Sequence, residues 1–214
     1  MKYKTFDTSC IQSSGCQAYC GDRFISWQPS TWPEAPVNFD DNFYRVIKKI
    51  FESTIIDEID NVISDAKIVN GSIEHRGHVV VTAQLCAIDA LASYAFFDES
   101  SEECAVCKRI DSKIRKYNKF IEEFFPDEYK QYNKELYTLY RNAVVHSWNL
   151  FEASIMPDSS AVTIKNGILC FGLLNFQDAL TSSLAQFLEK LKTDTKLQNN
   201  TLERYRKLKG TARK

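Results

Sequence analysis

Apolar positions recur at helical spacing through much of the chain. Between residues 41 and 64 they return every three or four residues, with Lys and Glu between them, at Phe43, Val46, Ile47, Ile50, Phe51, Ile55, Ile59 and Val62. This period places one apolar stripe along a helix. Residues 72 to 97 are instead apolar almost all round, which predicts a second helix at the centre of a bundle.

Three further helices follow from the same kind of pattern. Residues 111 to 125 form the first, and Pro126-Asp127 ends it and begins another that runs to about residue 148, because Pro and Asp are both favoured at helix starts. The buried stripe of that fourth helix is expected at Tyr132, Leu136, Leu139, Tyr140, Ala143 and Val144. A fifth helix is predicted over residues 176 to 191, and the polar residues 193 to 214 predict a basic, frayed or solvated last helix.

Two regions depart from the helical pattern. Residues 161 to 164 and 168 to 171 flank Asn166-Gly167, the turn dipeptide of a β-hairpin. Residues 1 to 38 hold three cysteines, three prolines and two tryptophans without a helical period, so we expect an irregular arm that contacts the domain through its aromatic side chains. The predicted fold is an all-α helical bundle over residues 39 to 192, with a small β-hairpin insertion, this N-terminal arm and a C-terminal tail over residues 193 to 214.

Composition narrows the class of protein. Of the 214 residues, 44% are hydrophobic, which is enough for a globular core, and the net charge of −1 argues against coating duplex DNA through positive charge. No apolar run opens the chain, and the longest apolar stretch is interrupted by Asp89, so we expect neither a secretory signal nor a membrane span. Seven cysteines, an odd number, favour free thiols in a reducing compartment. We therefore expect a cytoplasmic protein.

Candidate chemistry is concentrated near the end of the predicted fourth helix. The chain lacks glycine-rich nucleotide-binding loops, the H-E-x-x-H motif and the G-x-S-x-G motif. It carries Arg141, Asn142 and His146, and the last two are four residues apart on one helix face. Arg binds phosphate oxygens, and His moves protons near neutral pH. Because RNA supplies its own nucleophile, the 2′-hydroxyl, this set suits cleavage of an RNA phosphodiester without a metal or cofactor.

The stretch Arg141-Asn142-Ala143-Val144-Val145-His146 resembles the R-x4–6-H motif of the HEPN superfamily. The resemblance covers about residues 40 to 192, since the motif follows a long apolar helix that carries one acid and precedes a hairpin and another helix. It implies an α-helical bundle, usually dimeric, and in many members a metal-independent endoribonuclease whose motif Arg and His face each other across the dimer. Other members of the family lack catalysis and act as binding modules.

Asp89 is the acid in that apolar helix. Its sequence neighbours are small or apolar, and a buried carboxylate is costly unless it is paired. Arg141 is therefore its expected partner, with Asp89 orienting the guanidinium. The alternatives for Asp89 are a backbone amide, a Tyr hydroxyl or exposure to water.

Three other sets of residues have chemical interest. Cys104-x2-Cys107 has zinc-ligand spacing, and Cys16 and Cys20 would complete a set of four, although free thiols are the reading we favour. His75 and His78 share a helix face without an evident third ligand, which favours a solvated helix start. The basic tail is typical of a solvated face and is an alternative surface for steering RNA; it comprises Arg204, Arg206, Lys207, Lys209, Arg213 and Lys214.

The sequence thus predicts a metal-independent endoribonuclease, toxin- or defence-like, that acts on RNA as a homodimer. Arg141, Asn142 and His146 are its predicted catalytic residues, and Asp89 supports them. A non-catalytic helical protein that binds a partner, such as an antitoxin-like protein or an adaptor, is the alternative. A small adaptor held together by zinc is a third.

Overall fold

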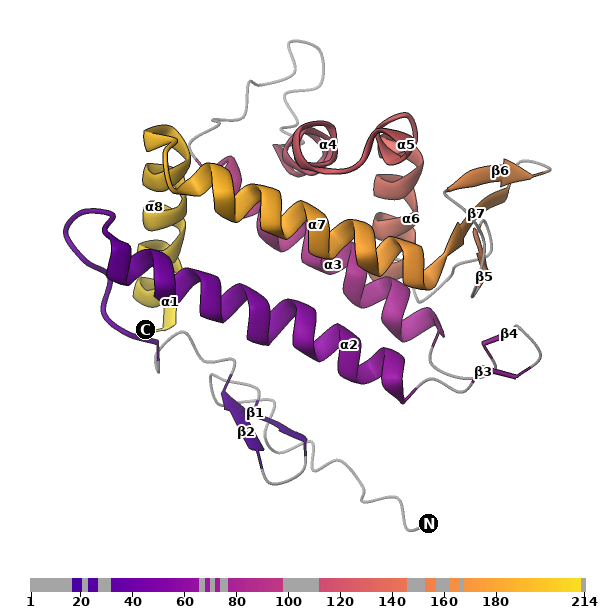
Figure 1. The fold of residues 1–214 in the computed structure, drawn as a ribbon, viewed down its shortest axis with the longest axis horizontal. Coiled ribbons are helices and arrows are strands. Elements are labelled where there is room, and N and C mark those ends of the chain that lie inside the picture. Colours follow the sequence, from indigo (N-terminus) through magenta and orange to yellow (C-terminus); the bar gives the residue numbers. More distant parts are fainter. Residues whose placement is uncertain are drawn as a thin grey trace.

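The computed structural model describes residues 17–20, 23–26, 32–65, 68–69, 72–73, 77–97, 112–145, 153–156, 162–165 and 168–212. Helices dominate these segments, and the strands form only small two- and three-stranded sheets (Figure 1). This confirms the predicted class, an all-α bundle with a small β-hairpin.

The first helical rod combines α1 (Asp41–Phe51), the π-helical turn η3 (Glu52–Ile56) and α2 (Asp57–Ser64), so the helix predicted over residues 41 to 64 is confirmed. Asp40 caps it, because its carboxylate accepts a 2.7 Å hydrogen bond from the backbone N–H of Phe43. At the π-helical turn the Thr54 hydroxyl donates to the carbonyl of Ile50. A π-turn inserts an extra residue into a helix and is common at functional sites.

Helix α3 (Gly77–Ala95) is the centre of the bundle, as its apolar sequence predicts, and contacts α2, α4, α6, α7 and α8. Leu85, Ile88 and Leu91 are fully buried there. The predicted start at residue 72 is wrong, because Ser72–Ile73 forms β4, which pairs with β3 (Ile68–Val69). Among the described helices, α3 is long and apolar enough to cross a membrane, but most of it is buried in the bundle, as expected for a core helix.

The polar side chains between α2, α3 and α7 (Leu173–Leu191) form a buried connection. The Gln84 side-chain amide donates to the Leu173 carbonyl and to the Gln177 side-chain oxygen, both at 3.1 Å. The Gln177 amide in turn donates to Asp60 at 2.8 Å. Burying an amide without hydrogen-bond partners is costly, so these hydrogen bonds favour one arrangement of α2 and α7 against α3.

The fourth predicted helix is interrupted. The segment between α4 (Ser112–Phe124) and α6 (Asn133–Val145) contains the short helix α5 (Asp127–Lys130). A turn separates α5 from α6, where the Tyr132 N–H donates to the Tyr129 carbonyl at 3.0 Å. Tyr129 is buried and its ring packs on Phe125 and Phe176, so a tertiary anchor sets the break in the helix.

The predicted hairpin is confirmed as β6 (Thr163–Lys165) and β7 (Ile168–Gly172), with Thr163 opposite Cys170. Strand β5 (Ala153–Met156) adds to β7 in parallel. Regular structure also occurs within the region expected to be irregular, since β1 (Gln17–Cys20) pairs antiparallel with β2 (Arg23–Ser26).

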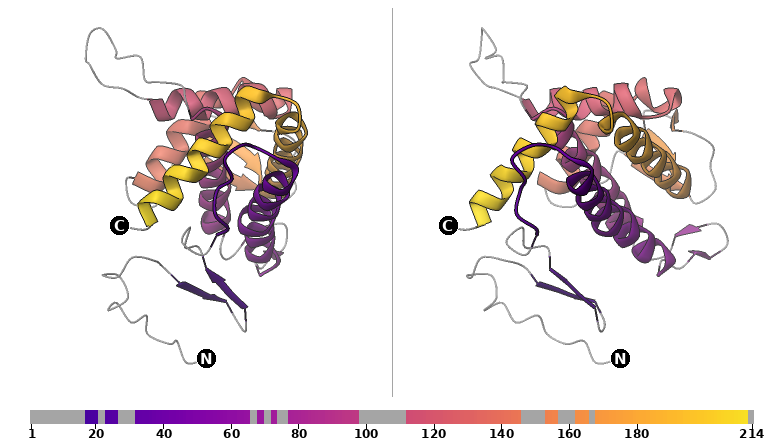
Figure 2. Two further views of the ribbon diagram at one scale, coloured as in Figure 1. Left: turned by 90° about the vertical axis from the view of Figure 1, so that its left-hand side faces the viewer. Right: turned by 60° about the vertical axis from the view of Figure 1, so that its left-hand side comes forward.

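Helix α8 (Thr195–Ala212) is packed rather than frayed. Tyr205 is fully buried, stacks on Trp32 with ring centroids 5.4 Å apart, and donates a 2.7 Å hydrogen bond to the Pro33 carbonyl. The contact of Trp32 confirms that the arm packs on the domain through an aromatic side chain. The segment that leads into α1 runs beside α8 (Figure 2). The prediction of a frayed or solvated helix was wrong because cations of α8 donate hydrogen bonds to this segment.

Two of these cations hold that segment directly. Arg206 donates to the Pro36 carbonyl at 2.7 Å and the Val37 carbonyl at 2.6 Å. Lys209, only 5% exposed, donates to the Trp32 carbonyl at 2.5 Å. Three carbonyls without strand or helix partners are thereby satisfied, which ties residues 32 to 37 to α8.

Candidate functional site

The predicted catalytic residues fall at the end of α6. Arg141 and Asn142 lie in α6 by their backbone, and His146 lies outside the described residues. The structure thus brings two of the three onto one element, as predicted. The described residues give no side-chain contact that joins the set.

Positions 141 and 142 continue two rows of residues along the backbone of α6. Upstream on this helix Lys134, Glu135 and Thr138 are exposed, whereas Leu136 and Leu139 are buried. Position 141 follows Lys134 by seven residues and position 142 follows Glu135 by seven, which is two helical turns. The two positions therefore fall in the same rows of the helix as Lys134 and Glu135.

The opposite side of α6 anchors the helix. The Tyr137 ring lies edge-on to the fully buried Tyr117 of α4, with centroids 5.4 Å apart. At the helix start the Asn133 amide donates to Glu122 at 2.7 Å. These contacts hold the first turns of α6 on α4, and α6 also contacts α3.

Asp89 is half-buried on α3 rather than enclosed. Its charge acts on Cys86, whose thiol pKa is raised by burial first and by Asp89 second. The structure therefore places the Asp89 carboxylate near the Cys86 thiol. Helices α3 and α6 are in contact, and the predicted pairing of Asp89 with Arg141 stays a prediction.

The described segments contain no cluster of three or more His, Cys, Asp or Glu side chains that would hold a metal ion. Cys16, Cys104, Cys107 and His75 lie outside those segments, and Cys20 is placed only by its backbone in β1. Neither the favoured free thiols at these positions nor the zinc alternative is therefore tested. His78 is exposed at the start of α3, in agreement with a solvated helix start.

A cavity of about 460 Å³ between the first helical rod and α3 is a feature that sequence reasoning missed. Apolar side chains make up most of its wall. The lining residues are Trp32, Ile50, Phe51, Thr54, Ile55, Glu58, Ile59, Val62, Ala83, Cys86, Ala87, Ala90, Ser93, Tyr94, Arg204 and Leu208. Its volume lies in the range of small-molecule sites.

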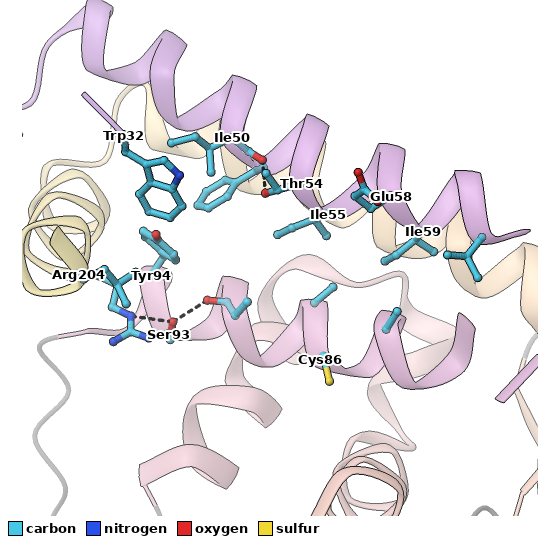
Figure 3. Close-up of a pocket in the computed structure, with 16 residues that line it drawn as sticks. Trp32, Ile50, Thr54, Ile55, Glu58, Ile59, Cys86, Ser93, Tyr94 and Arg204 are labelled. Carbon is cyan, nitrogen blue, oxygen red and sulfur yellow. Dashed lines mark hydrogen bonds between the residues drawn. The ribbon is translucent and has the colours of Figure 1, made fainter. Parts of the chain in front are cut away.

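Polar groups gather at one end of this cavity, where Trp32, Tyr94, Ser93 and Arg204 meet (Figure 3). The Arg204 Nε donates to the Ser93 hydroxyl at 3.1 Å, and that hydroxyl donates to the Ala90 carbonyl at 2.7 Å. Burial raises the pKa of the Tyr94 phenol, and the nearby Arg204 acts in the opposite direction. The phenol is therefore a hydrogen-bond donor at neutral pH.

One local signal for the cavity exists in the sequence. Ala83, Ala87 and Ala90 succeed each other at helical spacing on α3, and they line the same cavity as the larger Ile55 and Ile59. Small side chains opposite medium-sized ones leave space unless the helices approach closely. The sequence alone does not give that approach.

Comparison of this chain with protein families, with characterised proteins and with solved structures gives no match.

Proposed function

We propose that this protein is a metal-independent endoribonuclease whose site includes the end of α6. The observation that carries the proposal is the position of Arg141 and Asn142 on the last turns of a helix whose first turns are anchored to α4. His146 follows one residue after the end of that helix in the sequence. A cation, an amide and an imidazole within six residues are available to one phosphodiester group.

The chemistry assigned to these residues balances without a metal. His146 takes the proton of the RNA 2′-hydroxyl, the 2′-oxygen attacks phosphorus, and the bond from phosphorus to the 5′-oxygen breaks. The leaving oxygen takes a proton from an imidazolium, which gives a 2′,3′-cyclic phosphate and a 5′-hydroxyl. Arg141 binds the non-bridging oxygens, where negative charge develops, and Asn142 orients the phosphate.

Asp89 is assigned a positioning role toward Arg141. Its carboxylate lies on α3, which α6 contacts, and its half-buried setting strengthens an interaction with a nearby cation. Substitution of Asp89 should act through Arg141, so a loss of cleavage is expected without a change in the pH dependence set by His146.

A two-fold dimer is part of the proposal, because the reaction needs a base and an acid while α6 carries one His near its end. A two-fold axis beside α6 places two copies of the same patch together. The contact is expected to bury Val145 or Trp148, which lie at the end of α6 and three residues beyond it in the sequence. Cytoplasmic RNA is the expected substrate, in a toxin- or defence-like role.

The deciding experiment incubates the purified protein with transfer RNA and total RNA in excess chelator. His146→Ala should lower cleavage by roughly two to four decades, the scale for losing an acid–base group, with an unchanged thermal midpoint. His78→Ala is the matched control, because His78 is exposed on α3. If the wild type cleaves no RNA, the non-catalytic partner-binding alternative replaces this proposal. If His146→Ala cleaves normally, the assignment of the site to the end of α6 is wrong.

The shared site has its own test. Arg141→Ala and His146→Ala proteins should each be inactive alone, and a mixture that re-equilibrates should recover part of wild-type cleavage, because each mixed dimer holds one Arg141 and one His146 and so keeps one partial site. Sedimentation of the same samples gives the oligomeric state. Full activity in a strictly monomeric enzyme would contradict the dimer.

A further inference from the structure

The cavity beside the first helical rod combines an apolar wall with a single cation. Its long sides come from η3, α2 and α3, and contain Ile55, Ile59 and Ala87. Its polar end contains Arg204, and the acid Glu58 lies away from that end, on the side of α2 (Figure 3). A ligand that fits has an apolar body and a polar end directed toward Arg204.

Arg204 has unused hydrogen-bonding capacity. Within the part of the chain that the structure describes, its one hydrogen bond is from Nε to Ser93, and it forms no ion pair. The guanidinium is half-buried, and its two terminal nitrogens are the donors that bind a carboxylate bidentately. A cation in this setting is stabilised by an anion more strongly than a cation in water.

The dimensions of the cavity select the ligand length. Its lining on the first rod runs from Ile50 to Val62, which at 1.5 Å per helical residue is about 18 Å. An extended alkyl chain advances about 1.25 Å per carbon, from the length and angle of its bonds. A chain of about ten to fourteen carbons therefore spans the cavity.

We propose that this cavity binds a straight-chain fatty acid of about ten to fourteen carbons, with the carboxylate on Arg204. The Tyr94 phenol lies at the same end and can donate to the head group, while the Ser93 hydroxyl accepts from the Arg204 Nε and so helps to hold the guanidinium in place. The alkyl chain lies along Ile55, Ile59 and the alanines of α3, where its burial supplies most of the affinity. This binding is independent of the proposed ribonuclease activity.

Calorimetric titration with dodecanoate, below its micelle concentration, tests the proposal on the full chain. The wild type should bind dodecanoate at least about tenfold more tightly than dodecanol, because the alcohol lacks the charge that Arg204 pairs with. Arg204→Gln should weaken dodecanoate binding by about 10- to 100-fold and leave dodecanol binding unchanged. A purely structural role for Arg204 would weaken both ligands alike.

Two matched variants complete the design. Arg45→Gln removes the same charge from an exposed position on α1 and should bind dodecanoate like the wild type. Ala90→Met fills part of the cavity and should abolish binding of both ligands, with a circular dichroism spectrum and thermal midpoint at least equal to those of the wild type.

The opposite results are equally clear. Equal wild-type affinity for dodecanoate and dodecanol, or full dodecanoate binding by Arg204→Gln, overturns the assignment of the head group. Failure of the wild type to bind dodecanoate, or undiminished binding by a folded Ala90→Met protein, overturns the cavity as the fatty-acid site. Binding of an amphipathic helical peptide in place of dodecanoate counts against the proposal in the same way.

Discussion

The end of α6 and the cavity beside α3 are built in opposite ways. The first candidate site takes its residues from six consecutive positions, residues 141 to 146, and all of its chemistry is polar. The second takes its lining from residues 32, 50 to 62, 83 to 94 and 204 to 208, and its wall is mostly apolar. A motif of neighbouring residues is visible before folding, whereas a cavity exists only once distant segments meet.

The two regions also share no lining residue, so they should respond to substitutions separately. Their connection is on α3, where Cys86 lines the cavity and Asp89, the proposed support for Arg141, raises the pKa of its thiol. Measuring RNA cleavage and dodecanoate binding on the same variants therefore tests both the nuclease site and the fatty-acid site.

The largest effects are expected from two substitutions, one in each region, each of which should strongly lower the activity of its own region alone. Arg141→Ala should lower RNA cleavage by about 10²- to 10³-fold, because one stabiliser of transition-state charge is lost, and should leave dodecanoate binding unchanged. Arg204→Gln should do the reverse. Cleavage rates and calorimetric titrations of both proteins measure the crossing, and a loss of both activities in either variant would mean that the regions are coupled.

Removal of the buried cation of Lys209 should weaken ligand binding in the cavity and leave RNA cleavage unchanged. Lys209→Met deletes the donor to the Trp32 carbonyl, which should lower the free energy of unfolding by about 1–3 kcal/mol. Because Trp32 closes one end of the cavity, dodecanoate affinity should fall as well. Denaturant unfolding, with the exposed Lys49→Met as control, checks the stability; an unchanged midpoint would show that α8 does not hold the arm.

Alkaline pH should lower the stability of the folded protein through the buried side chains of Tyr129 and Tyr205. Burial raises the pKa of Tyr129, beside α6, and of Tyr205, beneath Trp32, to about 12 in each case. The folded state therefore keeps these protons in a pH range where the unfolded chain, with a tyrosine pKa of about 10, loses them. Their contribution to stability is present below about pH 10 and is lost as pH rises to about 12.

Unfolding in denaturant at a series of pH values from neutral to strongly alkaline measures that loss. Tyr129→Phe and Tyr205→Phe should each flatten the decline, and Tyr205→Phe also removes the hydrogen bond to Pro33. Tyr44→Phe, on a half-buried ring of α1, is the comparison. If the free energy of unfolding declines equally with pH in all of these proteins, titratable groups other than Tyr129 and Tyr205 cause the decline.

The smallest expected effect tests the link between the regions. Cys86 should be alkylated more slowly than an ordinary thiol at pH 8, because its raised pKa keeps it protonated. Asp89→Asn should move its pH profile of alkylation toward lower pH, since a negative charge beside the thiol is removed, and should also lower RNA cleavage. A shifted thiol profile with full cleavage would remove Asp89 from the proposed nuclease site and leave the cavity assignment intact.

Much of the fold was predictable because helix formation depends on local periodicity. The apolar stripe from Phe43 to Val62 specified the first rod, and Asn166-Gly167 specified the hairpin. Asp89 is a counterexample. Its apolar sequence neighbours predicted an enclosed carboxylate, yet its side of α3 is half-exposed, because burial depends on which helices cover that side.

The sequence by itself determined the helices, the hairpin and the placement of Arg141 and Asn142 on one helix, because each depends on residues within a few turns of one another. Only the tertiary structure decided the break between α5 and α6, which Tyr129 anchors, and the packing of the polar helix α8. It alone also decided the cavity and the position of Arg204 at its end. These features depend on partners that are distant in the sequence, such as Phe176 for Tyr129 and Trp32 for Tyr205, and no local pattern of the chain specifies such partners.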